Sequence, residues 1–283
     1  MFDTHTPSCV SLKDIDAEIE RLLSPNPSRV VDASRYHFSA GGSRVRAQLG
    51  LDAASALNLS PQASMACALA PELLHNASLI HDDLQDGDEM RRGTPAVWSR
   101  YGKGIAISTG DLLISAAYMA ITSHPQPAAA LHIMHDAISI TIAGQTADCC
   151  AGQPTPEDCA SIAAKKSGPL LALPIRLALI AAKVPGQDIV ISAGSALAIA
   201  YQTLDDIADR VADLENGLTN ICLSLEAIGH APAAAQMIAC NRAYSALETA
   251  KQDAIALQNG AGASLLNLAN YLEIQLNVIS NAS

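Results

Sequence analysis

Two acidic clusters, each at the end of an apolar segment, carry the residue types best suited to metal chemistry. The acids are Asp82, Asp83 and Asp86 in the first cluster and Asp205, Asp206 and Asp209 in the second. In a helix, residues four apart share one face, so the first and last acid of each cluster lie one turn apart. Like charges at this spacing destabilise a helix, and burial increases the cost. A bound cation would offset that cost.

The nature of these acids points to a hard divalent ion. Carboxylate oxygens suit Mg²⁺, which typically takes one or two carboxylates together with substrate phosphates. A solvated acidic helix end is an equally good interpretation of either cluster alone. It explains neither the apolar helix before each cluster nor the near identity of the two. We therefore expect two facing acidic helices to form a cage for a metal-chelated polyphosphate.

Basic residues that could hold the phosphates lie near the clusters. Arg91 and Arg92 follow the first cluster, and adjacent guanidiniums suit bidentate phosphate contacts. An ordinary surface charge is the alternative for each basic residue, but the pair beside the acids stands out among only 17 Lys and Arg residues. The further candidates are Arg44 and Arg46 after Gly41-Gly42, at a helix N-terminus that favours anions, and Lys165-Lys166-Ser167-Gly168.

Composition excludes several classes of protein. The chain has 283 residues, of which 49% are hydrophobic, so it can bury a sizeable core and is not disordered. A net charge of −11 and 3% aromatic residues argue against a nucleic-acid partner. No uninterrupted apolar stretch reaches the roughly 20 residues of a membrane span, and the N-terminus lacks the apolar region of a signal peptide.

The seven cysteines, Cys9 among them, form no CxxC pair and no metal-ligand rhythm. Small buried apolar side chains are the best interpretation of such cysteines. A reducing, cytoplasmic compartment is therefore the expected location.

Nearly every segment has the composition and spacing of a helix. We expect helices over about 12–23, 44–57, 61–86, 105–121, 128–149, 157–183, 187–213, 219–227, 232–258 and 264–278, with a short one near Trp98. The breaks between them are short, and no stretch alternates with the period of a strand. The sequence predicts one all-α domain over residues 1–283, an antiparallel bundle of about ten or more helices around a central cavity.

The motifs, taken together, resemble the trans-isoprenyl diphosphate synthase (polyprenyl synthetase) family. Residues 72–95 are similar to its first aspartate-rich motif and the Arg-Arg-Gly-Thr-Pro that follows it, and residues 202–209 to its second motif. Residues 41–46 resemble its Gly-Gly-Lys-Arg-x-Arg, and Gly144-Gln145 and Lys166-Ser167-Gly168 resemble its Gly-Gln and Lys-Thr-Gly signatures. The resemblance covers about residues 40 to 225 and implies the isoprenoid synthase fold.

The resemblance also implies a role for each residue. Asp82, Asp86 and Asp205 would ligate Mg²⁺ on an allylic diphosphate, with Asp83, Asp206 and Asp209 as nearby acids in the metal site. The allylic diphosphate would be held by Arg91, Lys166 and Ser167. Isopentenyl diphosphate would be held by Arg46, His75 and Arg92, beside Gly42 and Arg44. The reacting carbons would lie along Gln202 and Gln145. Loss of the allylic diphosphate and attack by the isopentenyl double bond would then need no protein nucleophile.

Two departures from the family pattern affect substrate binding. Ser43 stands where the family has Lys, and the segment 210–220 after the second motif lacks the family's Gly-Lys loop. Small residues, Ala77 and Ser78, lie below the first motif, where the family sets product length, which favours geranylgeranyl diphosphate. The alternatives are a terpene cyclase or non-standard coupling enzyme on the same fold, and a non-catalytic partner subunit. The family expectation for assembly is a homodimer.

Overall fold

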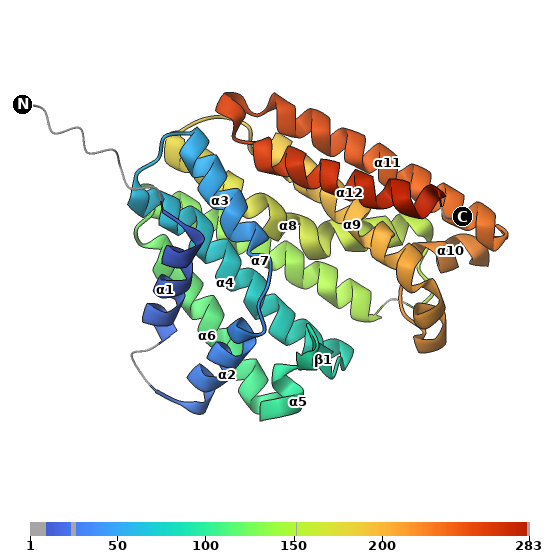
Figure 1. Ribbon diagram of the computed structural model, residues 1–283, viewed down its shortest axis with the longest axis horizontal. Coiled ribbons are helices and arrows are strands. Elements are labelled where there is room, and N and C mark those ends of the chain that lie inside the picture. Colours follow the sequence, from blue (N-terminus) through green and yellow to red (C-terminus); the bar gives the residue numbers. More distant parts are fainter. Residues whose placement is uncertain (1–9, 24–26, 151, 282–283) are drawn as a thin grey trace, which may run out of the picture. The chain divides into compact units, whose positions relative to one another are not determined.

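The computed structural model of the chain describes residues 10–23, 27–150 and 152–281 (Figure 1). Cys9 and most of the N-terminal segment that lacks the signal-peptide pattern lie outside these ranges. Contacts group the chain into two compact units, the first made of the residues up to Met134 with Leu173–Pro185, and the second of His135–Ala172 with Gly186–Ser283. The described residues are almost all helical, which confirms the all-α prediction; that the chain is one domain stays a prediction.

The first unit is built mainly from the N-terminal half of the chain. Its elements are α1 (Leu12–Leu23), α2 (Arg29–Ser39), α3 (Val45–Ala56), α4 (Pro61–Asp86), β1 (Met90–Arg91), β2 (Thr94–Pro95), α5 (Val97–Tyr101) and α6 (Lys103–Ile121). Two long helices, α7 (Pro127–Cys150) and α8 (Pro156–Ala182), run from one unit into the other. The second unit adds α9 (Gln187–Asn216), α10 (Ile221–Ala227), α11 (Pro232–Ala256), the short 3₁₀ helix η1 (Gln258–Gly260) and α12 (Ala263–Asn281).

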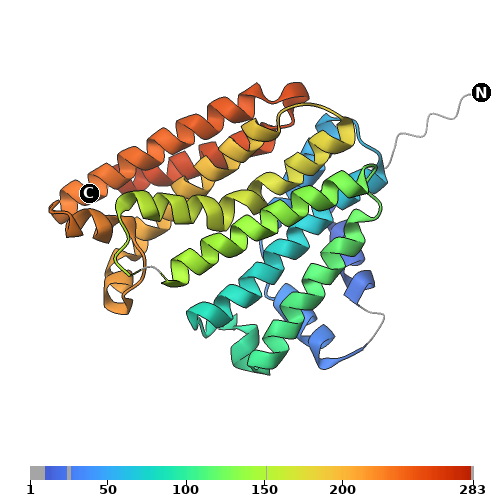
Figure 2. The same cartoon turned by 180° about the vertical axis from the view of Figure 1, so that it is seen from behind.

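Helix α4 is the central helix of the first unit, and its ends follow from the sequence. Ser60 caps the N-terminus by accepting a hydrogen bond from the Ala63 backbone N–H at 3.3 Å, and Pro61 occupies the first turn. Gly87 ends the helix in the left-handed conformation. The helix packs against α3 and α6, and Figure 2 shows α6, in green, beside it from behind. The first acidic cluster therefore lies on the last turns of a rigid, buried helix.

A close helix crossing fixes α3 on α4. A Cβ atom added to Gly50 of α3 would lie 2.5 Å from the carbonyl oxygen of Cys67. Only a glycine allows the two backbones to approach this closely. The segment that carries Arg44 and Arg46 is thereby held against the helix that carries the acids.

Helix α6 is, within the described residues, the one helix long and apolar enough to cross a membrane by length and composition. Its apolar window is 44% buried within the protein, where it packs against α4 and α2. Core helices of this kind meet the same length and composition criteria.

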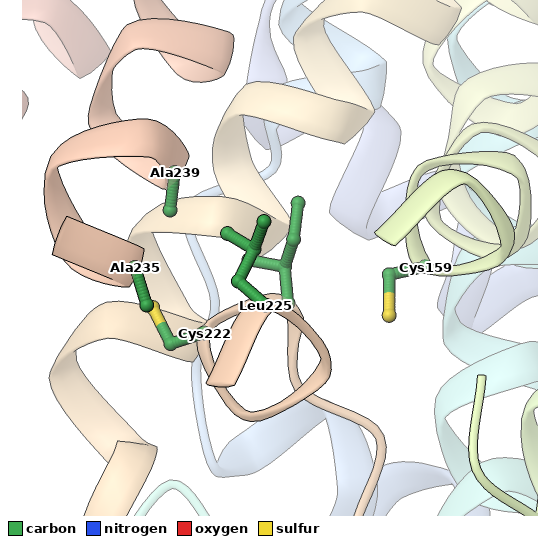
Figure 3. Close-up of a cluster of buried hydrophobic side chains, with 6 residues drawn as sticks. Cys159, Cys222, Leu225, Ala235 and Ala239 are labelled. Carbon is green, nitrogen blue, oxygen red and sulfur yellow. The ribbon is translucent and has the colours of Figure 1, made fainter. Parts of the chain in front are cut away.

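The second unit has its own apolar centre, where α9 packs against α11 and α12, and α10 packs against α9 and α11. A small cluster around Cys222 and Leu225 of α10 and Ala235 and Ala239 of α11 lies at one end of it, with Cys159 of α8 (Figure 3). The six cysteines in the described ranges are free thiols, and four of them are buried. The interpretation of the cysteines as small core residues is confirmed for these four, whereas Cys149 and Cys150 are exposed.

Helix α2, the hairpin of β1 and β2, and the short 3₁₀ helix η1 were absent from the sequence prediction. Helix α2 begins after Ser28, whose side chain accepts a hydrogen bond from the Val31 backbone N–H at 3.4 Å. The second element is the antiparallel pair of β1 and β2, in which Met90 faces Pro95 and Arg91 faces Thr94. Strands of two residues are too short to show an alternating pattern, so they leave no periodic signal in a sequence.

Candidate active site

The first acidic cluster occupies the last turn and a half of α4. Asp82 is half-buried, Asp83 is 1% exposed, and Asp86 is exposed. Burial is the main cause that raises the pKa of Asp83, and the hydrogen bonds from Arg91 act in the opposite direction. The structure therefore separates the three acids by environment: Asp82 and Asp86 are accessible and Asp83 faces inward.

A tight hairpin presents the two arginines that follow the cluster. The two-residue turn between β1 and β2 is Arg92-Gly93, and both residues have positive φ, of 53° and 76°. This is the backbone geometry that two-residue hairpins favour. Arg91, on the strand side, donates hydrogen bonds from Nε and Nη2 to Asp83 Oδ1, the first at 2.8 Å. Arg91 and the acidic cluster are thus tied together.

Arg92 meets the glycine pair before α3. Its Nη1 donates to the Gly41 carbonyl, and a Cβ atom on Gly42 would lie 2.6 Å from that nitrogen. Gly42 also has a φ of +143°, which glycine adopts without strain. Burial and the neighbouring Arg91 and Arg44 lower the pKa of Arg92. Positive charge concentrated in this way favours a bound anion.

Arg46 of α3 and His75 of α4 form a second polar pair at the site. Arg46 Nη1 lies 3.1 Å from His75 Nε2. Burial, then the charges of Arg46 and Arg92, hold the pKa of His75 well below its usual range. The ring is therefore neutral at pH 7, and since Arg46 can only donate, Nε2 accepts and the ring proton resides on Nδ1. Nδ1–H is thereby left as a donor.

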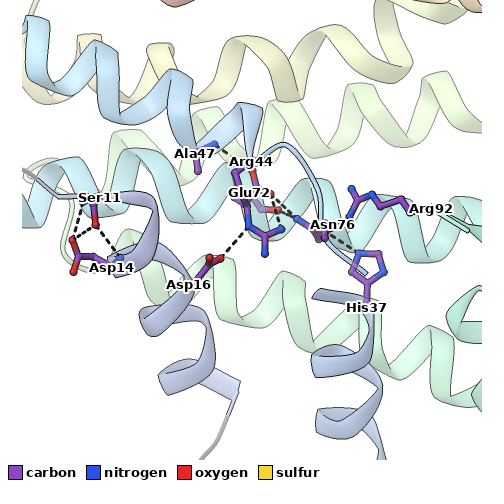
Figure 4. Close-up of polar contacts among 10 residues, drawn as sticks. Ser11, Asp14, Asp16, His37, Arg44, Ala47, Glu72, Asn76 and Arg92 are labelled. Atoms are coloured by element: carbon purple, nitrogen blue, oxygen red, sulfur yellow. Dashed lines mark hydrogen bonds and ion pairs between the residues drawn. The ribbon is translucent and has the colours of Figure 1, made fainter. Parts of the chain in front are cut away.

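Arg44 has a different environment from the one expected of a substrate ligand. Its Nε donates to Asp16 Oδ1 at 3.0 Å, and its Nη1 lies 3.7 Å from Glu72 Oε1 (Figure 4). Its guanidinium also lies over the Phe38 ring, 5.1 Å from the centroid. These contacts join α1, α2, α3 and α4, so Arg44 positions the glycine-rich segment.

A buried polar network supports this arrangement. Glu72, 2% exposed, accepts hydrogen bonds from the Ala47 backbone N–H and from Asn76 Nδ2, and Asn76 Oδ1 lies 3.0 Å from His37 Nε2 (Figure 4). Burial lowers the pKa of His37 to about 4, so the imidazole is neutral and donates to Asn76. The network fixes α2 and the start of α3 on α4.

The second acidic cluster has the same order of exposure on α9. Asp205 is half-buried, Asp206 is 3% exposed and Asp209 is exposed. Burial, then the charge of Asp209, raises the pKa of Asp205 to about 6, and burial raises the pKa of Asp206 to about 6. The repulsion between Asp205 and Asp209 is the cost that a bound cation would relieve.

The acids fit a metal that arrives with its substrate. Within the described ranges, no three His, Cys, Asp or Glu side chains converge to hold a metal ion by themselves. Mg²⁺ typically needs only one or two carboxylates when substrate phosphates and water complete its shell. Asp82 with Asp86, and Asp205 with Asp209, supply such pairs of accessible carboxylates on one helix face each.

The segment after the second cluster is a continuation of α9 rather than a loop. The helix extends to Asn216 and ends at Gly217, and α10 begins four residues later at Ile221. Asn220 caps α10 through its Oδ1, and its Nδ2 donates to the Asp206 carbonyl at 2.6 Å. The family's Gly-Lys loop is thus replaced here by three further residues of helix and a short, well-anchored connection.

Three other predicted site residues lie on α7 and α8 in the second unit. Lys166 Nζ donates to Asp148 Oδ2 at 2.7 Å, and Ser167 follows it, half-buried. Gln145 is 6% exposed, one turn before Asp148 and Cys149. A Cβ atom on Gly144 would collide with the backbone at Lys165 and Lys166, so the glycine lets the two helices approach. Gln145 and Lys166 therefore lie on closely packed helices.

The sequence did not identify the residues that hold other site residues in place through hydrogen bonds. Asp148 lies three residues after Gln145, on the same helix face, and that spacing was a usable signal. Glu72, Asn76 and His37 gave no such signal, because single polar residues in apolar segments do not show which partner they meet. The contacts that pair them are formed by tertiary packing.

Known proteins share both the sequence pattern and the fold. The family model for polyprenyl synthetases matches residues 27–221, more than half of the chain. A geranylgeranyl diphosphate synthase from Cereibacter sphaeroides is 35% identical over 204 residues, which cover 68% of this chain and 69% of that protein. A short chain isoprenyl diphosphate synthase from Methanothermobacter thermautotrophicus is 32% identical over 210 residues, which cover 70% of this chain and 63% of that protein.

A solved structure extends the likeness to the fold. A polyprenyl synthase from Caulobacter crescentus, complexed with calcium and isoprenyl diphosphate, superposes with a TM-score of 0.81 over 92% of this chain and 93% of that chain, at 20% identity. The likeness shows that the chain has the all-α fold of that polyprenyl synthase. The chain belongs to the polyprenyl synthetase family, as its motifs predicted. It spans less than two thirds of the length of the first relatives that it matches.

Proposed function

We propose that the chain is a Mg²⁺-dependent prenyltransferase that joins isopentenyl diphosphate to an allylic diphosphate and forms a longer linear prenyl diphosphate. One observation carries the proposal. Two acidic helix segments have the same order of half-buried, buried and exposed aspartates, and the first is tied to an arginine pair. An enzyme that binds diphosphates through metal ions and guanidiniums needs both features. The named relatives, a short chain isoprenyl and a geranylgeranyl diphosphate synthase, support it.

The metal sites would be formed by the accessible acids. Asp82 and Asp86 on α4, and Asp205 with Asp209 on α9, would hold Mg²⁺ ions that share their remaining positions with the allylic diphosphate. A metal held by these acids would supply positive charge to stabilise the departing diphosphate. The calcium and isoprenyl diphosphate in the Caulobacter crescentus structure support divalent metal as a class, and Mg²⁺ is the specific proposal.

The cationic side chains would orient the two substrates. Arg91, Lys166 and Ser167 would hold the allylic diphosphate, and Arg92, Arg46 and His75 would hold isopentenyl diphosphate. Because Arg46 donates to Nε2 of His75, the Nδ1–H of His75 is free to donate to a phosphate oxygen. The neutral ring supplies this donor without adding a further charge.

The reaction then needs no protein nucleophile. The allylic carbon–oxygen bond breaks and its electron pair leaves with the diphosphate. The double bond of isopentenyl diphosphate attacks the allylic cation, and a proton is lost to the released diphosphate. Gln202 and Gln145 would lie along the reacting carbons, where amide dipoles orient the substrates.

Product length would be set on the apolar part of α4. Ala77 is 1% exposed, and Ser78 has its hydroxyl turned to the His75 carbonyl at 2.9 Å. Neither side chain is large enough to stop a growing prenyl chain one turn below Asp82. We therefore propose geranylgeranyl diphosphate as the main product.

A homodimer in the cytoplasm completes the proposal. Ile107 and Met119 of α6 are 49% and 57% exposed, and Tyr118 beside Met119 is 40% exposed. Large apolar side chains exposed on one helix are typical of surfaces that a second subunit covers. Sedimentation of the purified chain at micromolar concentration tests this assembly.

Product analysis tests the function. The purified chain is incubated with Mg²⁺, isopentenyl diphosphate and each short allylic diphosphate in turn, and the products are identified by mass. We expect linear prenyl diphosphates, with the twenty-carbon product dominant. Hydrocarbons or rings would instead indicate a cyclase or non-standard coupling enzyme, and turnover only with a second synthase present would indicate a partner subunit.

A further inference from the structure

A cavity of about 500 Å³ opens within the second unit, among α8, α9, α10 and α11. Cavities of this size are typical of small-molecule binding sites. The residues that line it include none of the acids, arginines, lysines or glutamines proposed to hold the metal ions and the two diphosphates. The proposed function therefore leaves this cavity without a role.

The spacing of the lining residues explains how the cavity forms. On α9 the lining positions are 192, 195, 196 and 199, and on α11 they are 242, 245, 246 and 249. Each set has the spacing of one helix face, and the two helices pack against each other. Most side chains on these two faces are short, so they leave space between the helices.

The more buried part of the lining is apolar. Ala196 and Ile221 are 7% and 2% exposed, and Ile199 is half-buried. The polar residues lie further out, since Ser192 and Ser245 are exposed. The cavity thus has an apolar floor and a polar mouth, which suits a ligand with an apolar tail and a polar head.

Arg242 is the one charged residue of the lining. Its Nη2 donates to Glu157 Oε1 at 2.8 Å, and the two side chains are 36% and 73% exposed. Arg210 makes a closed pair by contrast, because its Nε and Nη2 donate to both carboxylate oxygens of Glu226, each at 2.6 Å. A guanidinium has five N–H donors, so the contact with Glu157 leaves Arg242 able to hold a second acceptor.

The charge at the mouth favours a ligand with a single negative charge. Arg242 already shares its charge with Glu157, in a chain with a net charge of −11. A dianionic head would add negative charge that no second cation of the lining offsets. A carboxylate carries one charge and matches the planar fork of the guanidinium. It can also take the place of the Glu157 carboxylate, which is mostly in water and returns there at little cost.

We propose that this cavity binds a monocarboxylate with an apolar tail. The carboxylate lies on Arg242, where the hydroxyls of Ser192 and Ser245 add neutral donors, and the tail covers Ile199 and Ile221. The inference goes beyond the proposed function and does not depend on it, because the lining is separate from the residues proposed to bind the substrates.

Binding of octanoate to the purified chain, measured by calorimetry without diphosphates or Mg²⁺, tests the role of the arginine. Octan-1-ol has the same tail with a neutral head. Arg242→Met should weaken octanoate binding by about tenfold or more and leave octan-1-ol unchanged, and the control Arg210→Met should change neither. Wild-type protein that binds no octanoate at millimolar concentration, or equal octanoate affinity in wild type and Arg242→Met, would overturn the proposal.

A surface variant tests the competition with Glu157 without touching the cavity wall. Glu157→Gln removes the charge that now occupies the guanidinium, so octanoate should bind roughly two- to fivefold more tightly. Octyl phosphate, which carries a second charge, should bind the wild type no more tightly than octanoate. Unchanged or weaker octanoate binding in Glu157→Gln, or tighter binding of octyl phosphate, would contradict a site for a single carboxylate.

Two further measurements locate the bound probe. Ala246→Phe places a ring in the cavity and should abolish binding of both octanoate and octan-1-ol, whereas the control Ala233→Phe, at an exposed position of α11, should not. In the wild type, octanoate should slow amide hydrogen exchange over residues 192–199 and 242–249 and at Ile221. Slowed exchange confined to other segments would show that octanoate binds elsewhere and would overturn the proposal, even if Ala246→Phe fails to fold.

Discussion

Lys166 on α8 donates a hydrogen bond from Nζ to Asp148 Oδ2 on α7, across 2.7 Å. Both side chains are about three quarters buried, with exposed fractions of 23% and 24%. The carboxylate fixes the ammonium at a point where Gly144 lets the two helices approach. Lys166 is therefore presented as an oriented donor, in contrast to its exposed neighbour Lys165.

Replacement of this lysine should weaken binding of the allylic diphosphate. Lys166→Met removes a charge-assisted contact worth about 1.5–3 kcal/mol, which corresponds to roughly a ten- to hundredfold higher KM. Asp148→Asn should have a smaller effect in the same direction, because it only loosens the ammonium. Steady-state kinetics of both variants, with Lys165→Met as the control, check this. A Lys165→Met loss as large as that of Lys166→Met would show that only general charge matters.

Ser43→Lys should improve binding of isopentenyl diphosphate. Ser43 is exposed between Gly42 and Arg44. Gly42 has no side chain and so leaves room for the Arg92 guanidinium, and Arg44 holds the segment in place through Asp16. A lysine there adds an ammonium beside Arg46 and Arg92, and one such contact lowers KM by roughly tenfold. Ser55→Lys, on the exposed side of α3, is the control. An unchanged KM for isopentenyl diphosphate in Ser43→Lys would contradict the placement of this diphosphate.

The pH dependence of stability should reveal the buried His37. Its folded pKa of about 4 lies below the unfolded value near 6.5, so the unfolded chain binds the proton first as pH falls. The stability that neutral His37 contributes is thus complete above pH 6.5 and lost between pH 6.5 and 4, by about 3 kcal/mol. Unfolding free energies of wild type and His37→Gln are measured from pH 7.5 to 4. The wild-type value should fall more steeply, so that the difference between the two proteins changes by that amount.

A control on the same helix separates the contribution of His37 to the pH dependence of stability from that of the acids. The raised pKa values of the acids make the folded chain more stable as the pH falls, which is opposite to the effect of His37. Ser34→Ala, also buried on α2, changes no titratable group, so its difference from wild type should stay constant over the same range. A His37→Gln difference that is equally constant would show that His37 titrates alike in the folded and unfolded chain.

A bulky residue at position 78 should shorten the product. Ser78→Phe places a ring one turn below Asp82, where the small serine leaves room for a growing chain. The main product should change from twenty to fifteen carbons or fewer, as read by mass. Ser64→Phe, further up the same helix and away from the cluster, is the control for general effects on α4. Unchanged twenty-carbon product in Ser78→Phe would show that another element limits the chain length.

Long apolar helices were predicted well because their periodicity and caps are local. Helix α4 has the expected bounds, set by Ser60-Pro61 and Gly87, and α1 is confirmed at Leu12–Leu23. Helix α9 was expected to end at Asp213 but extends to Asn216, because Ala212, Leu214 and Glu215 favour helix and the first glycine after them is Gly217. Helix α2 was missed because its mean hydropathy is low and its stability comes from packing on α6.

The sequence identified the residues of the candidate site more completely than it identified the contacts between them. The spacing of Asp82 with Asp86 and of Asp205 with Asp209 identified the accessible acids. Residues four apart in a helix lie on the same face, so the residue spacing alone shows which acids lie together. Spacing also suggested that Asp83 and Asp206 belong to the same sites. That they turn inward to Arg91 and Ile221 depends on a hairpin and a helix start that only tertiary structure brings close.

The requirement for both acidic clusters in one reaction is tested most directly by turnover of three purified variants. Asp82→Asn and Asp205→Asn each remove one proposed metal ligand, and Asp136→Asn alters an exposed acid of α7 as the control. With saturating Mg²⁺, isopentenyl diphosphate and an allylic diphosphate, each of the first two should lose about a hundredfold or more in kcat while the fold and the control are preserved. Wild-type rates in either Asp82→Asn or Asp205→Asn would contradict a metal-dependent prenyl transfer that uses both clusters.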